Sequence, residues 1–233
     1  MIPLGTGTRT PTFPFVTYAI VIANVAVFLQ EVSAPNTDTF IDSFALIPYD
    51  LTHGIVLAPP SPAWPPETLL TSMFMHASFL HIFFNMLFLV VFGPAMEYAC
   101  GHLGYLAYYL LCGTIGGLAQ IAIDPNNHVP TIGASGAIAG VLGGYIVTFP
   151  TSTVGTLVPI GCLPLFLRLP AMLVIGLWAG VQFLHGWGAI TTKTLGEQGS
   201  GIAYFAHIGG FASGVILLPL FRRTRGRGRR TWS

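Results

Sequence analysis

Two polar residues of this chain combine nucleophilic chemistry with a hydrophobic setting. Ser135 lies in a Gly-Ala-Ser-Gly motif and His207 in an Ala-His-Ile-Gly-Gly motif, each within a few residues of the start of an apolar segment long enough to cross a bilayer. A polar group without a partner in hydrocarbon costs several kcal/mol. We therefore expect the two side chains to face each other in a water-accessible hollow, where the imidazole takes the hydroxyl proton and makes the serine a nucleophile.

A second pair of polar residues could stabilise the negative charge that such a reaction creates. His81 and Asn85 are four residues apart in one predicted helix, so they share one face. The His81 ring N–H, the Asn85 amide and the backbone N–H of Ser135 are donors for an oxyanion, and one such donor can be worth roughly 3 kcal/mol in the transition state. A polar clamp between helices is the alternative interpretation of His81 and Asn85.

Composition indicates that lipid is the main solvent of the elements that hold these residues. The 233 residues are 53% hydrophobic and 7% charged, with a mean hydropathy of +0.72, whereas soluble domains carry about 25% charged residues. We predict an all-α membrane protein with one domain over residues 1–221 and a basic tail over residues 222–233. The domain is a bundle of six transmembrane helices, predicted at residues 15–30, 69–99, 103–123, 135–149, 170–188 and 201–221.

The basic residues predict how this bundle is oriented. With six spans, Arg9, Arg168 and the arginine-rich tail fall on one side and Lys193 on the other, so both termini are expected in the cytoplasm, at the plasma or inner membrane. The tail is interpreted as a membrane-flanking basic segment rather than a nucleic-acid site. The second, fourth and sixth helices then all enter from the outer side, which places the polar residues at comparable depth.

The connection between the first two helices, residues 31–66, is long, acidic and rich in proline. Its amphipathic stretch at residues 40–47 predicts that it lies in the membrane interface. Three tryptophans are interpreted as further interface anchors, namely Trp64, Trp178 and Trp187.

Small residues predict how the fourth and sixth helices meet. Each carries a small residue at every fourth position, which allows two helix backbones to approach closely. Ser135 directly precedes the first of these stripes and His207 follows the start of the second, so packing of the stripes would bring both residues to one end of the contact. The stripes are Gly136, Gly140 and Gly144, and Ala206, Gly210 and Gly214.

The predicted base has no carboxylate partner in the sequence. No acidic residue is placed in the outer half of a predicted span, and Glu97 falls at the cytoplasmic end of its segment. We therefore predict a dyad of Ser135 and His207 rather than a triad with a buried acid. His185 is a weaker candidate for the base, because no stripe of small residues brings it to Ser135.

No cofactor or metal is predicted. His76 and His81 are five residues apart, which does not align two ligands on one helical face, and no HExxH motif is present. The three cysteines, Cys100, Cys112 and Cys162, lack CxxC spacing and are interpreted as small apolar residues.

The three motifs together resemble the signature of the rhomboid intramembrane serine proteases. They are the Gly-Ala-Ser-Gly motif, the Ala-His-Ile-Gly-Gly motif and the spacing from His76 through His81 to Asn85, in that family's order. The resemblance implies that Ser135 is the nucleophile and His207 the general base. It also implies that transmembrane segments of other proteins are the substrates, cut near the outer membrane face.

The same resemblance assigns the surrounding residues. His81 and Asn85 would line the oxyanion site, His76 would lie near its mouth, and Gly133 and Gly136 would shape and line the site. One position departs from the family pattern. Many bacterial members carry a tyrosine one turn after the nucleophile, where it stacks on the histidine, and here that position is Ala139. We expect another aromatic, such as Tyr204 or Tyr145, to hold His207 instead.

Two other functions fit parts of the sequence. A catalytically inactive relative would bind transmembrane segments without cutting them, but such proteins should lose the nucleophile or the base. A small transporter would also line a path with intramembrane serine and histidine, although no internal repeat is evident. The oligomeric state and the natural substrate are left open by the sequence.

Overall fold

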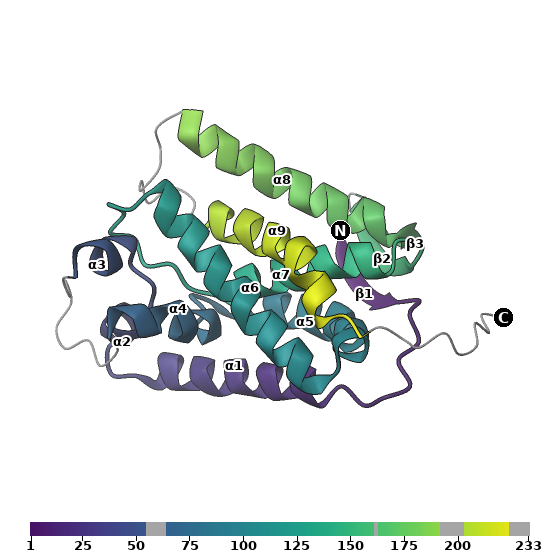
Figure 1. The fold of residues 1–233 in the computed structure, drawn as a ribbon, viewed down its shortest axis with the longest axis horizontal. Coiled ribbons are helices and arrows are strands. Elements are labelled where there is room, and N and C mark those ends of the chain that lie inside the picture. Colours follow the sequence, from purple (N-terminus) through teal and green to yellow (C-terminus); the bar gives the residue numbers. More distant parts are fainter. Residues whose placement is uncertain (55–63, 161–162, 192–202, 224–233) are drawn as a thin grey trace.

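Six apolar helices form the body of the protein (Figure 1). The computed structural model describes residues 1–54, 64–160, 163–191 and 203–223. Five of the helices are long and apolar enough to cross a membrane, and α7, with 14 residues, is shorter. Each helix lies within or near one predicted segment, and only the second starts much later than predicted. The helices are α1 (Phe15–Ser33), α5 (Phe79–Cys100), α6 (His102–Ile123), α7 (Ser135–Thr148), α8 (Ala171–Thr191) and α9 (Tyr204–Phe221).

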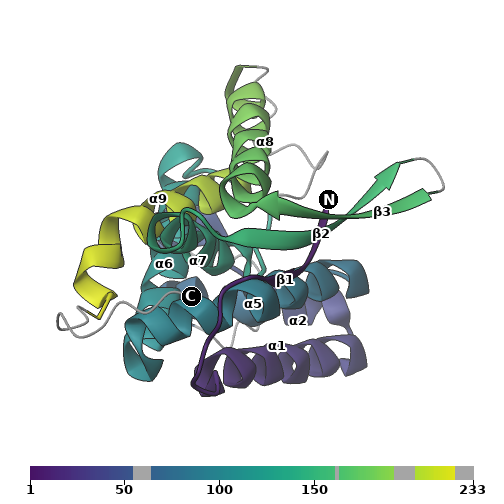
Figure 2. The same cartoon turned by 90° about the vertical axis from the view of Figure 1, so that its right-hand side faces the viewer.

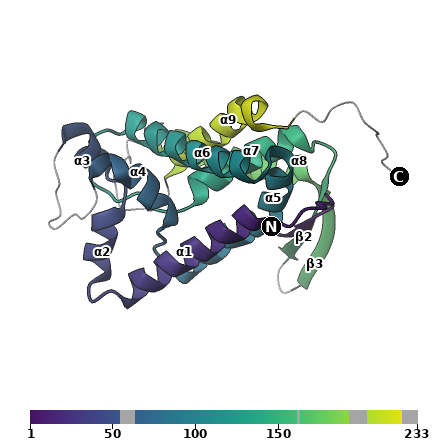
Figure 3. The ribbon, with the colours of Figure 1, turned by 60° about the horizontal axis from the view of Figure 1, so that its bottom comes forward.

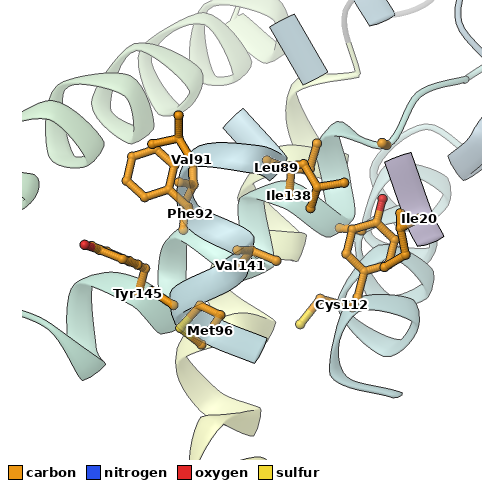
Figure 4. Packing of buried hydrophobic residues seen from close by; sticks show 14 of the residues in the cluster. Ile20, Leu89, Val91, Phe92, Met96, Cys112, Ile138, Val141 and Tyr145 are labelled. Atoms are coloured by element: carbon orange, nitrogen blue, oxygen red, sulfur yellow. The ribbon is translucent and has the colours of Figure 1, made fainter. Parts of the chain in front are cut away.

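The short helix α7 lies at the centre of the bundle. Every residue from Gly136 to Tyr145 is buried, because α5, α6 and α9 all pack against this helix. Figure 4 shows part of the resulting core, in which Phe92 of α5 meets Tyr145 of α7 with ring centroids 5.0 Å apart. By contrast, α8 lies on the outside and packs mainly on α9 (Figure 2). The element that carries Ser135 is therefore surrounded by protein.

The segment before α5 is broken, and the sequence-based prediction of one helix from residue 69 is wrong there. Short turns of helix occupy η1 (Pro65–Glu67), α4 (Thr68–Thr71) and η2 (Ser72–Phe74). The chain then runs extended to Ser78, whose side chain accepts a hydrogen bond from the His81 N–H and caps α5. The continuous helix thus begins only at Phe79.

The long connection after α1 holds two short helices, α2 (Thr37–Phe44) and α3 (Pro48–His53), at one end of the bundle (Figure 3). A backbone bridge from Leu46 to Thr131 ties this connection to the segment that leads into α7. The connection that sequence analysis placed at the interface therefore lies beside the start of α7.

A small antiparallel sheet lies at the opposite end of the bundle (Figure 1) and was not expected from the sequence. Its order is β1 (Ile2–Thr6), β2 (Thr153–Ile160) and β3 (Leu163–Pro170). Strands β2 and β3 form a hairpin that projects sideways from the helices (Figure 2).

Glu97 fixes the arrangement of helices at the sheet end. Its buried carboxylate accepts hydrogen bonds from the backbone N–H groups of Val16 and Thr17 at 2.9 and 2.7 Å, and from the Thr17 hydroxyl at 2.7 Å. An acid at a helix N-terminus is stabilised by the unpaired N–H groups there. The backbone N–H of Arg223 bonds to the Ala99 carbonyl, so the start of α1 and the end of α9 both meet the end of α5.

Candidate active site

The structure brings Ser135 and His207 into direct contact. Ser135 Oγ and His207 Nε2 are 2.7 Å apart, which is a good hydrogen-bond distance for a hydroxyl and an imidazole. Ser135 is the first residue of α7, and His207 lies in the first turn of α9. The histidine is therefore nearer to the helix start than the predicted six residues, because α9 begins at Tyr204.

Glycine makes this contact possible, and the predicted packing of the two stripes is present. A Cβ added at Gly210 would collide with the Gly136 carbonyl oxygen, and one at Gly214 with the Gly140 carbonyl oxygen. The Tyr108 hydroxyl of α6 lies 2.8 Å from the carbonyl oxygens of both Gly140 and Gly214 and is shared between them. The helices α7 and α9 thus touch backbone to backbone just beyond the Ser135–His207 pair.

The second nitrogen of His207 is also engaged. His207 Nδ1 lies 2.8 Å from Gln182 Oε1 on α8, and the Trp178 ring of the same helix lies 5.8 Å from the histidine ring between centroids. Trp178 was expected at the membrane interface, but it contacts the histidine. Gln182 and Trp178 are four residues apart and hence on one face of α8.

The two aromatic residues that sequence analysis suggested for holding His207 have other neighbours. Tyr204 stacks on His185, with ring centroids 5.4 Å apart. The Tyr145 hydroxyl hydrogen-bonds to the Thr8 hydroxyl at 2.9 Å, at the sheet end of α7. A spacing of four residues between a large aromatic and an amide was the signal in the sequence that could have pointed to α8.

Asn85, His81 and Gly133 come together beside Ser135. Gly133 has a φ of 123°, a backbone conformation that favours glycine. A Cβ added there would lie 2.8 Å from His81 Nε2 and 3.6 Å from Asn85 Nδ2. Gly133 is two residues before Ser135. The face of α5 that carries His81 and Asn85 therefore points to the turn that leads into α7.

The donors of this cluster are suited to binding an oxyanion. Asn85 Nδ2 is buried and has no hydrogen-bond partner among the residues that the structure describes. The Gly133 N–H, in contrast, donates to the Ser72 carbonyl at 2.8 Å and is already paired. The N–H of Ser135 belongs to the first turn of a helix, where backbone donors have no intrahelical acceptor.

His76 lies deeper than expected. Its ring is fully buried, 5.0 Å from the His81 ring between centroids, rather than at the mouth of a site. It precedes α5 in the extended segment, and its backbone N–H donates to Glu31 Oε2 at 3.1 Å. Glu31 was expected in the first loop, but α1 continues to Ser33 and buries this carboxylate. The buried His76 ring therefore packs edge to face against the His81 ring.

Within the described ranges, no three His, Cys, Asp or Glu side chains gather closely enough to hold a metal ion. Cys100 and Cys112 are buried, free thiols, and Cys162 lies outside the described residues. The groups around Ser135 and His207 are amides, hydroxyls and imidazoles, which suit acid–base and nucleophilic chemistry.

Comparison with known proteins agrees with this architecture. The family model described as Rhomboid domain matches residues 64–224, so the chain belongs to the rhomboid family and is an integral membrane protein. The chain is 27% identical over 235 residues to RHOMBOID-like protein 4 of Arabidopsis thaliana, which covers 88% of this chain and 52% of the relative. It is 28% identical over 211 residues to Rhomboid protein 1, mitochondrial, of Saccharomyces cerevisiae, covering 85% and 51%.

A bacterial relative carries an activity in its name. The chain is 32% identical over 136 residues to Rhomboid protease GluP of Bacillus subtilis, which covers 58% of this chain and 24% of that protein. The chain thus spans about half or less of the length of these curated relatives.

Proposed function

We propose that this protein is an intramembrane serine endopeptidase that cleaves transmembrane segments of other proteins with a dyad of Ser135 and His207. The observation that carries the proposal is the 2.7 Å contact between Ser135 Oγ and His207 Nε2 inside a bundle of apolar helices. A hydroxyl becomes an effective nucleophile when a base at this distance takes its proton. Membership of the rhomboid family supports the same reaction class.

The reaction proceeds in two halves. Ser135 Oγ attacks the scissile carbonyl carbon while its proton moves to His207 Nε2, and the carbonyl becomes an oxyanion. Collapse of this intermediate breaks the C–N bond, and the leaving amine takes the proton from Nε2–H. Water then attacks the resulting ester with His207 again acting as the base, which frees the second product and restores Ser135.

The oxyanion is stabilised by the donors gathered beside the nucleophile. The Asn85 amide is the strongest candidate, because its Nδ2 is buried without a partner among the described residues and any donation to the substrate replaces no existing bond. The N–H of Ser135 and the ring N–H of His81 complete the set. Gly133 supplies the turn that lets the substrate carbonyl approach these donors.

The proposed substrates and cut position follow from where the dyad sits. Ser135 and His207 both lie in the first turn of their helices, at the end of the bundle opposite the sheet. With both termini in the cytoplasm, this end faces the outer leaflet, so a transmembrane segment is cut near the outer membrane face. A helical peptide bond is protected by its own backbone hydrogen bonds, so we expect helix-destabilising residues near the cut.

The test is cleavage of a transmembrane reporter substrate by the purified protein. Ser135→Ala and His207→Ala should each lower kcat by at least about 1000-fold, because the members of such a unit act together. Cleavage at the wild-type rate by either variant would refute the assignment. Binding of the reporter without cleavage by the wild-type protein would indicate instead an inactive relative that recognises transmembrane segments.

A further inference from the structure

We propose that Gln182 is a positioning residue of the dyad, whose side-chain carbonyl holds His207 in the tautomer that can receive the Ser135 proton. The inference rests on the proposed function and adds to it a third side chain from a third helix. The Ser135 and His207 motifs alone give no indication of this residue.

The geometry around the imidazole carries this proposal. His207 Nε2 lies 2.7 Å from Ser135 Oγ, and its Nδ1 lies 2.8 Å from Gln182 Oε1, so each ring nitrogen has one partner. A carbonyl oxygen can only accept a hydrogen bond, so this contact requires a proton on Nδ1. A neutral imidazole protonated at Nδ1 has its lone pair on Nε2, which is the atom that must take the serine proton.

Helix α8 fixes the ring from one side. Trp178, one turn before Gln182, lies against the imidazole with its plane tilted by 43°. The aromatic contact limits rotation of the ring, while the amide selects its tautomer. Trp178 and Gln182 together hold the His207 ring in place. A tyrosine at the position of Ala139 would otherwise stack on this ring.

The acceptor beside His207 Nδ1 is an uncharged amide rather than a carboxylate. A carboxylate in this position would both orient the imidazole and stabilise the imidazolium that forms during the reaction. Gln182 provides the orientation with no formal charge. From the other helices, the titratable groups that face His207 are the Ser135 hydroxyl of α7 and the His81 ring of α5.

The position of Gln182 also links the dyad to the placement of α8. This helix is the least buried of the long helices, with 17% of its span buried. Its contact with His207 crosses from α8 to α9, so it exists only while α8 is packed on α9. Displacement of α8 would release Nδ1 and leave the tautomer of His207 unselected.

The experiment measures kcat and KM against pH for Gln182→Leu and Gln182→Glu in the full chain, with Val181→Ala, on the exposed face of α8, as the matched control. We expect Gln182→Leu to lower kcat by about 10- to 100-fold with KM unchanged, the range found when the hydrogen-bond partner of a metal-bound histidine is removed. Gln182→Glu should restore most of kcat because the acceptor is present again. The acid limb of the kcat–pH profile of Gln182→Glu should move to higher pH, since a carboxylate stabilises the His207 imidazolium.

Two outcomes would overturn this role. One is Gln182→Leu cleaving within twofold of wild type, and the other is Gln182→Glu and Gln182→Leu being equally slow with the same pH profile. Nitrogen-15 NMR of the His207 ring in Ser135→Ala protein reports the tautomer without catalysis. The ring should carry its proton on Nδ1 when Gln182 is present, and it should show a mixture of tautomers when Gln182→Leu is added. If the wild type fails to cleave at all, the proposed function fails, whereas a Ser135-dependent protease indifferent to Gln182 refutes only this inference.

Discussion

Replacing Gly210 by alanine should separate the two halves of the dyad. The added Cβ would collide with the Gly136 carbonyl oxygen, and reaching the 3.4 Å of an ordinary contact requires α7 and α9 to move apart by more than 1 Å. Gly136 follows Ser135 directly, and Gly210 is three residues after His207, so this movement is passed to the 2.7 Å contact between Oγ and Nε2. A misplacement of about 1 Å can cost roughly 100-fold in rate.

The assay is cleavage of a transmembrane reporter by Gly210→Ala in detergent, with thermal unfolding measured on the same sample. We expect a loss of about 100-fold in kcat together with a loss of about 1–3 kcal/mol in stability, which is usual for an overpacked contact. Gly176→Ala on α8 is the matched control, since a Cβ there meets no atom within 4 Å, and it should behave as wild type. A Gly210→Ala protein that cleaves within threefold of wild type would show that close packing of α7 on α9 does not position the dyad.

Three further substitutions test separate parts of the account. Asn85→Ala should lower kcat by about 100- to 1000-fold with KM nearly unchanged, because an oxyanion donor acts in the transition state, and steady-state kinetics that show only a KM effect would argue for a polar clamp. Gly133→Ala should lose stability and activity in unfolding and cleavage assays, since φ is 123° and the new Cβ would lie 2.8 Å from His81 Nε2; an equally stable, active variant would contradict the turn geometry. Glu97→Gln should cost about 1–3 kcal/mol by weakening the charged hydrogen bonds at the start of α1 without changing kcat of the folded fraction, and a selective loss of kcat would place Glu97 in the reaction.

The sequence predicts the pairing of Ser135 with His207 because both residues adjoin stripes of small residues. A helix repeats every 3.6 residues, so a small residue at every fourth position defines one face, and two such faces pack closely. His81 and Asn85 follow from the same periodicity. These patterns predict which faces of two helices pack together. They therefore also predict which residues lie side by side at the outer end of that contact.

The residues that sequence analysis missed depend on information outside any one helix. Gln182 reaches His207 because of how α8 is rotated about its axis. The four-residue spacing of Trp178 and Gln182 marks one face of this helix, but it does not tell which neighbouring helix that face meets. The sheet pairs residues 2–6 with residues 153–160, a contact too distant in sequence for local patterns to indicate. The start of α5 was readable, because Ser78 before an apolar run is a typical N-cap.

The most direct test of the central claim is to map the site of modification by a fluorophosphonate probe, which reacts with serine that a neighbouring base has activated. Mass spectrometry of the labelled wild-type protein should find the adduct on Ser135, with no adduct in Ser135→Ala and little in His207→Ala. An adduct that forms equally fast on Ser135 without His207, or a wild-type protein in which Ser135 stays unmodified, would contradict the assignment of these two side chains as nucleophile and base.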